Sequence, residues 1–98
     1  TRESGDVGVA YWSDVQLVKK LLLQAARNHE DVLPEPEPLV VFADFGESSL
    51  DFKLIFTLNE SFRAQFPKSD MRFEIDRLFR ENNITIPFPQ RDIHIIQK

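Results

Sequence analysis

Nine consecutive residues in the middle of the chain alternate between apolar and largely polar side chains, and this pattern constrains the possible folds most strongly. The apolar positions are Leu50, Phe52, Leu54, Phe56 and Leu58. Because successive side chains of a strand point to opposite faces, these residues predict a strand with one apolar face and one face that meets water. A sheet built around this strand needs a single covering layer of helices.

The first candidate for this covering layer is a helix predicted over residues 14–28. Ser13 is the expected N-cap, and Gln16 three residues later completes a capping box. Trp12 and Leu17 stand at the two positions of a hydrophobic staple, in which an apolar residue before the cap packs on one inside the helix. These signals predict a well-defined start for the helix.

A second helix is predicted over residues 70–81, where apolar residues recur at helical spacing. Ser69 and Asp70 offer a cap for its first turn. Pro67 is expected to exclude an earlier start, because proline breaks a helix interior. The pair Asn82-Asn83 can end the helix with a left-handed residue.

Three more segments are predicted as strands. They are residues 7–11, the continuous apolar run 39–45, which indicates a buried strand, and a last strand that begins at Ile84. Residues 1–6 are polar and are expected to form a flexible lead-in. The prolines within residues 30–38 exclude helix and predict an extended connector.

The predicted element order is therefore βαββαβ. With right-handed crossovers this order gives an α+β fold, a ferredoxin-like two-layer sandwich with a four-stranded sheet and two helices on one face. In that topology the last strand lies at the sheet edge. Pro87 and Pro89 agree with this placement, because both remove N–H donors from the same side of the strand. Residues 90–98 regain their donors and can pair on either side.

The composition limits the classes of function. Ninety-eight residues make one domain, 1–98. The formal net charge of -4 argues against a nucleic-acid partner, which usually requires a basic face. No apolar run approaches the roughly 18–20 residues needed to cross a bilayer. Since the chain begins with Thr1 and has no signal-peptide pattern, we expect it to be an excised piece of a longer protein.

No motif specific for catalysis is present, so neither an enzymatic activity nor a cofactor is expected. The chain has no cysteine, and its two histidines, His29 and His94, are far apart in sequence, so no metal site is expected. His29 is interpreted as a cation at the end of the first helix.

Three carboxylates, Asp44, Glu47 and Asp51, surround a predicted hairpin that contains Gly46 and Ser49. Paired carboxylates can act in acid–base catalysis, but aspartate and serine commonly bond turn backbone groups, so a role in the turn is favoured. Gly46 is expected to adopt a positive φ there, which would make larger residues destabilising.

Arg91 and Asp92 follow the proline pair near the end of the chain. Two interpretations of them stay open. They are either surface charges on a sheet edge or residues that fix a subunit contact, because an open edge is normally protected or used.

The chain resembles the cytoplasmic C-terminal α/β domain of the small-conductance mechanosensitive ion channel family (MscS-like). The resemblance covers nearly the whole chain, and its most specific motifs are the FGxSSLxF hairpin and the closing PFPQ segment. The matching segments are Val7–Tyr11, Ser13-Asp14 with the following helix, Pro36–Pro38, Phe45–Phe52, Ile75–Arg80 and Ile86–Asp92. The motif residues that the resemblance assigns to structure and assembly are Gly46, Ser49, Asp51, Phe52, Pro87, Phe88, Pro89, Gln90, Arg91 and Asp92.

The resemblance implies a bacterial, homo-oligomeric membrane channel, heptameric in well-known members, that opens under tension and releases ions and small solutes on hypo-osmotic shock. This domain would lie on the cytoplasmic side of the inner membrane, as part of a cage through which solutes pass. Residues 90–98 would begin the passage toward an axial barrel strand. Trp12 departs from the family, which usually has a small or polar residue there. Two interpretations stay open, a local role in the staple with Leu17 or an altered subunit contact.

Two other functions compete with this interpretation. One is a stand-alone, ferredoxin-like module that binds a small molecule for regulation, and the other is a small enzyme. A membrane-spanning sequence upstream of Thr1 would favour the channel domain over both.

Overall fold

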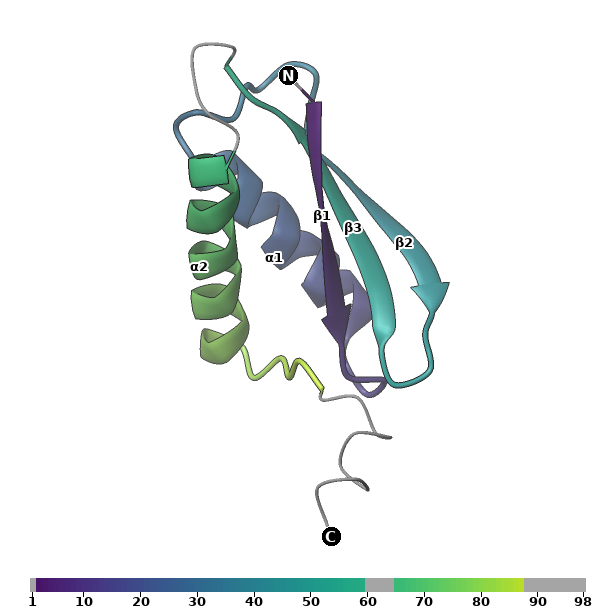
Figure 1. Ribbon diagram of the computed structural model, residues 1–98. Coiled ribbons are helices and arrows are strands. Elements are labelled where there is room, and N and C mark those ends of the chain that lie inside the picture. Colours follow the sequence, from purple (N-terminus) through teal and green to yellow (C-terminus); the bar gives the residue numbers. More distant parts are fainter. Residues whose placement is uncertain (1, 60–64, 88–98) are drawn as a thin grey trace, which may run out of the picture.

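The computed structural model describes residues 2–59 and 65–87. Three strands and two helices follow one another within these ranges. They are β1 (Arg2–Val9), α1 (Val15–Asn28), β2 (Leu39–Phe45), β3 (Leu50–Thr57) and α2 (Gln65–Glu81). The strands form one sheet, and both helices cover the same face of it (Figure 1). The two-layer α+β arrangement predicted from the alternating strand is confirmed.

The sheet has the strand order β1-β3-β2, and both pairings are antiparallel. The alternating strand is therefore the central one. Val7 lies opposite Phe52 and Val40 lies opposite Leu54, so the apolar face of β3 extends onto both neighbours. Within the described residues, β1 and β2 each have one free edge.

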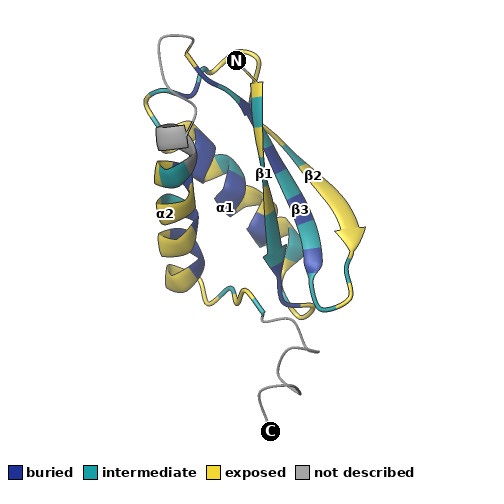
Figure 2. Cartoon of the chain, in the orientation of Figure 1, coloured by how far each residue is buried: buried dark blue, intermediate teal, exposed yellow. Residues whose placement is uncertain are grey.

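The hydrophobic core lies between the sheet and the two helices, where β3 alternates between buried and half-buried residues (Figure 2). Leu22 of α1 and Phe79 of α2 are fully buried against it. The helical layer covers one face of the sheet, as the one-sided pattern of β3 requires.

The apolar run 39–45 does form a strand, but the prediction that it is buried was wrong. β2 lies at the sheet edge, and six of its seven residues are exposed. The sequence pattern indicated burial because the run is apolar on both faces, whereas an edge strand under one helical layer buries only part of one face.

The predicted start of the first helix was displaced by one residue. Asp14 is the N-cap, and its carboxylate accepts hydrogen bonds from the backbone N–H groups of Gln16 and Leu17 at 3.1 and 3.2 Å. Ser13 and Asp14 are both good capping residues, and the aspartate occupies the position. Trp12 is 78% exposed and so does not provide the buried half of a staple.

The second helix begins at Gln65, five residues before the predicted start. Pro67 lies within the first turn of α2, where the missing N–H has no helical acceptor in any case, so the proline does not break the helix. The predicted left-handed stop is confirmed, because Asn83 has a φ of 60°. The backbone N–H of Ile84 then bonds to the carbonyl of Phe79 at 2.8 Å.

The two ends of the predicted sheet differ from the expectation. β1 begins at Arg2 rather than Val7, so residues 2–6 belong to the sheet. Residues 84–87 do not form a strand, although the backbone N–H of Ala10 bonds to the carbonyl of Thr85 at 2.8 Å. Since residues 88–98 lie outside the described part, the four-stranded ferredoxin-like layout is not confirmed, and the described sheet has three strands.

Candidate assembly site at the hairpin end of the sheet

Four of the predicted motif residues meet at the hairpin between β2 and β3. The backbone N–H of Gly46 bonds to the carbonyl oxygen of Ser49 at 2.7 Å, which closes the turn. The Ser49 hydroxyl donates to the Asp51 carboxylate at 2.6 Å. Phe52 is the first fully buried residue of β3 after this turn and is 2% exposed. The predicted hairpin is present, with Gly46 and Ser49 in its turn and Asp51 and Phe52 in β3.

Gly46 is required for a different reason from the one predicted. No glycine in the described part of the chain has a positive φ, so backbone conformation does not select it. A Cβ at this position would lie 2.6 Å from Oδ2 of Asp51 and 2.9 Å from the carbonyl oxygen of Ser49. Both distances are shorter than side-chain carbons tolerate, so the close approach of the turn and the Asp51 side chain leaves room only for glycine.

The end of β1 is tied to the same hairpin. The phenol of Tyr11 donates a hydrogen bond to the carbonyl oxygen of Gly46. Gly8 lies beside the Ser49–Asp51 pair, and a Cβ there would be 3.1 Å from the Ser49 hydroxyl oxygen. Tyr11 carried no sequence signal for this role because it is 35 residues from Gly46.

Two carboxylates of the hairpin bond to neighbouring groups. Asp44 accepts a hydrogen bond from the backbone N–H of Phe45 at 2.8 Å, and Asp51 is held by Ser49. Asp44 and Asp51 are opposite each other in the β2–β3 register. Asp44 and its backbone partner Phe45 both belong to β2, so the predicted role of Asp44 in the turn is not confirmed.

An aromatic cluster lies beside this hairpin. Phe42 stacks on the buried Phe52, with ring centroids 4.7 Å apart, and lies at a tilt against Phe45 at 5.0 Å. Phe45 is nevertheless 72% exposed. The cluster therefore presents an ordered aromatic surface to the outside of the domain.

The other predicted motif residues lie in the C-terminal segment. Pro87 is partly buried and stands outside any strand. Phe88, Pro89, Gln90, Arg91 and Asp92 lie outside the described residues, as does His94. The hairpin motif and the closing motif are thus not brought together in the part of the chain that the structure describes.

His29 connects the two helices instead of acting only as a terminal cation. Its Nδ1 accepts the backbone N–H of Asp31 at 3.0 Å, and its Nε2 lies 3.2 Å from a carboxylate oxygen of Asp70 in the second turn of α2. Because Nδ1 accepts, the proton of the neutral ring is on Nε2. Across residues 2–59 and 65–87, no three metal-ligating side chains gather into a candidate metal site.

A second link between the helices involves Glu74 of α2. Its carboxylate accepts from the Asn28 amide of α1 at 3.3 Å and from Arg77 at 2.6 Å. The hydrogen bonds from Arg77, more than the weaker one from Asn28, hold the pKa of Glu74 below its ordinary value despite partial desolvation. The link is structural and lies away from the hairpin.

With this geometry established, comparisons with known proteins identify the class. A family model described as "Mechanosensitive ion channel MscS, C-terminal" matches residues 5–86. The chain therefore belongs to the C-terminal domain family of MscS mechanosensitive channels. The match includes the hairpin motif and both helices.

Individual relatives agree with this assignment. The chain is 42% identical over 89 residues to the mechanosensitive channel MscK of Escherichia coli. This alignment covers 91% of this chain and 8% of that protein. It is 40% identical over 95 residues to an uncharacterized MscS family protein of Haemophilus influenzae. That alignment covers 97% of this chain and 9% of the relative. The chain thus spans less than a tenth of the length of these two relatives.

A solved structure has the same fold. The chain is similar to Helicobacter pylori MscS in its closed state, with a TM-score of 0.84 and 27% sequence identity over 90% of this chain and 35% of that one. Within the described residues of the present chain, no helix is both long and apolar enough to cross a membrane.

Proposed function

We propose that this chain is a cytoplasmic cage domain of a homo-oligomeric mechanosensitive channel that releases ions and small solutes on hypo-osmotic shock. Its role in that channel is subunit assembly and solute filtering, without catalysis. The observation that carries the proposal is the family match over residues 5–86, together with 42% identity to a named mechanosensitive channel. The proposal includes a heptameric state and a location in the inner membrane through transmembrane segments. It also includes ions and small solutes as the permeating species.

The hairpin site supports a structural role in this assembly. Gly46, Ser49 and Asp51 are held by hydrogen bonds and close contacts inside the domain, and so they fix the shape of its end. We propose that the motif residues act by positioning the apolar surface that adjoins them, and that residues 90–98 begin the passage toward an axial barrel strand.

A domain exchange tests the proposed function. The small-conductance mechanosensitive channel of Edwardsiella ictaluri is 32% identical to this chain over 92 residues. Replacing its matching region with this chain should give a channel that protects a channel-deficient bacterial strain against hypo-osmotic shock. The measurements are survival and tension-activated current in membrane patches. A chimera that reaches the membrane as an oligomer but neither conducts nor protects would refute the proposal, whereas the same exchange with a scrambled segment provides the control.

A further inference from the structure

His29 lies in the turn that leads from α1 toward β2, and its side chain is only 11% exposed. It is the C-cap residue of α1, at the end of the sheet opposite the β2–β3 hairpin (Figure 1). The carbonyl of Asp31 in this turn accepts the backbone N–H of Asn59 at 3.1 Å. The N–H of Leu33 bonds to the carbonyl of Thr57 at 2.8 Å. A change at His29 therefore acts on a turn that is bonded to the end of β3 and that begins the connector 30–38.

The two ring nitrogens of His29 have different partners. Nδ1 accepts the backbone N–H of Asp31 at 3.0 Å, and Nε2 lies 3.2 Å from Oδ2 of Asp70 on α2. A neutral ring with its proton on Nε2 makes both bonds at once. Oδ2 of Asp31 also lies near the ring, but its distance of 3.8 Å from Nδ1 is longer than a hydrogen bond.

Protonation of the ring reverses the role of Nδ1. An imidazolium ring donates from both nitrogens, so Nδ1 can no longer accept the N–H of Asp31. The carboxylate of Asp31, at 3.8 Å, is then the nearby acceptor for the new Nδ1–H. The backbone bond is available only to the neutral ring, and a hydrogen bond from Nδ1 to the carboxylate is available only to the cation.

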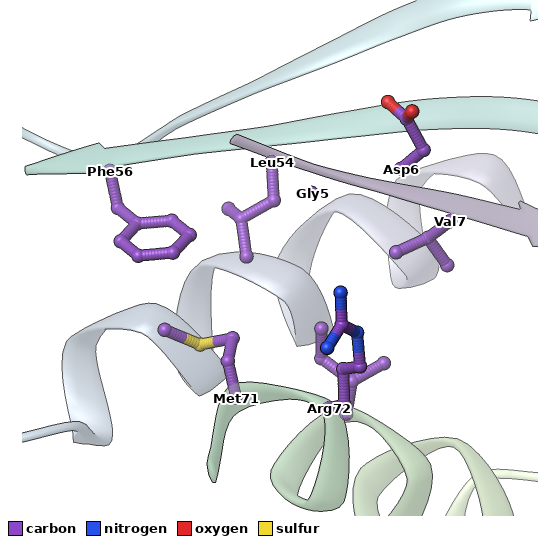
Figure 3. A pocket seen from close by; sticks show the side chains of 8 residues that line it. Gly5, Asp6, Val7, Leu54, Phe56, Met71 and Arg72 are labelled. Atoms are coloured by element: carbon purple, nitrogen blue, oxygen red, sulfur yellow. The ribbon is translucent and has the colours of Figure 1, made fainter. Parts of the chain in front are cut away.

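Asp70 is held beside the ring by the packing of α2. The next residue, Met71, is 4% exposed and lies with Leu54 and Phe56 of β3 around an apolar cavity (Figure 3). Nε2 carries a proton in both charge states of the ring, so it can donate to Asp70 in both. This contact keeps the ring in place while Nδ1 changes its partner.

The charged groups that face the ring come from its own turn and from α2. Within residues 2–59 and 65–87, the carboxylates at ion-pair distance from the ring are those of Asp31 and Asp70. Glu74, one turn further along α2, is bonded to Arg77 at 2.6 Å. Arg27, near the end of α1, is exposed. The end of β3 contributes backbone groups to the turn.

From this geometry we infer that His29 is a proton-operated switch for the turn between α1 and β2. The neutral ring holds the backbone N–H of Asp31, whereas the cationic ring releases it and binds the Asp31 carboxylate. Release of this N–H loosens the turn, the bond from Asn59 and the start of the connector 30–38. The switch goes beyond the proposed channel role and does not depend on it.

Nuclear magnetic resonance of the full 98-residue chain tests the switch. The range is about pH 5 to 8, in which histidine changes its charge. Nitrogen chemical shifts of the ring identify the protonated nitrogen and give the titration midpoint of His29. We expect the neutral ring to carry its proton on Nε2.

Amide hydrogen exchange, normalised to the intrinsic rate at each pH, reports the response of the turn. The protection of the Asp31 amide should fall several-fold on acidification, with the same midpoint as the ring of His29. The Asn59 amide should lose protection with it. The Gly46 amide is the internal control and should not respond, because it bonds to the Ser49 carbonyl at the other end of the sheet.

Three variants separate this ring from other titrating groups. His94→Ala removes the second histidine of the chain and should leave the response intact. Asp70→Asn removes the anion beside Nε2, so the ring midpoint and the Asp31 response should move together to lower pH. His29→Asn offers an uncharged oxygen in place of Nδ1 and should keep the Asp31 amide protected over the whole range.

An Asp31 amide whose normalised protection stays constant while His29 titrates would overturn the inference. A neutral ring with its proton on Nδ1, a ring that does not titrate in this range, or a response that persists in His29→Asn would overturn it as well. If His29→Asn does not fold, Asp70→Asn decides, because an amide midpoint that stays in place while the ring midpoint moves also contradicts the switch.

Discussion

Replacing Gly46 with alanine should destabilise the domain, although the glycine has no positive φ. The new Cβ would lie 2.6 Å from Oδ2 of Asp51 and 2.9 Å from the carbonyl oxygen of Ser49. Neither neighbour can move freely. The Ser49 carbonyl closes the turn by accepting the Gly46 N–H at 2.7 Å, and the Asp51 side chain is held by the Ser49 hydroxyl at 2.6 Å.

The expected loss of unfolding free energy depends on which contacts must change to make room for the new Cβ. Overpacking a well-packed site costs about 1–3 kcal/mol, and a lost intramolecular hydrogen bond costs about 0.5–1.5 kcal/mol. We therefore expect Gly46→Ala to lower the free energy of unfolding by about 2–3 kcal/mol. In a domain of this size such a loss lowers Tm by roughly 10–20 °C.

Urea unfolding followed by circular dichroism measures this change, and Gly5→Ala is the matched control. Gly5 is in the same sheet and a Cβ there meets nothing within 4 Å, so alanine should be neutral or stabilise by about 0.4–1 kcal/mol. Adding Asp51→Ala to Gly46→Ala removes the shorter of the two contacts and should recover part of the loss. If Gly46→Ala and Gly5→Ala unfold at the same urea concentration, the close-approach explanation is wrong.

Three further predictions concern the cap, the tyrosine and the helix pair. Asp14→Ala should cost about 0.5–2 kcal/mol in urea unfolding, whereas Ser13→Ala should leave α1 unchanged; the reverse order would restore Ser13 as the cap. Tyr11→Phe removes only the phenol that bonds the hairpin carbonyl and should cost about 0.5–1.5 kcal/mol, and an unchanged unfolding midpoint would show that this bond contributes nothing. Because Arg77 lowers the folded-state pKa of Glu74, its stabilisation is present above the ordinary pKa of 4.5 and is lost as pH falls through the lower folded value. Glu74→Gln should therefore flatten the acid limb of a stability–pH curve, and a parallel curve would contradict this.

The fold was predictable where one local pattern had one structural meaning. The alternation from Leu50 to Leu58 identified the central strand, and its single apolar face required the helical layer that the structure has. Asn83 likewise ended α2 in the left-handed conformation that its sequence position indicated. In each case the signal and the structure involve the same few residues.

Predictions failed where two local signals competed, or where the structure depends on a contact in the folded chain that has no local sequence pattern. Ser13 and Asp14 are both capping residues, and sequence alone does not choose between them. Pro67 was interpreted as a helix breaker, yet proline is compatible with a first turn. The Tyr11–Gly46 bond joins residues far apart in the chain, and the contact between Gly46 and Asp51 depends on the path of the turn, so neither has a sequence signature.

The most informative failure concerns the apolar run 39–45, because its apolar side chains are exposed on both faces of an edge strand. A strand that is apolar on both faces is expected between two covering layers. In this sheet Val41 faces away from the helices, as its pairing with Lys53 shows, while Phe42 and Phe45 face them at an edge that the helices do not fully cover. The strand therefore carries apolar side chains on both of its faces, whereas the helices of the described domain cover only one face of the sheet.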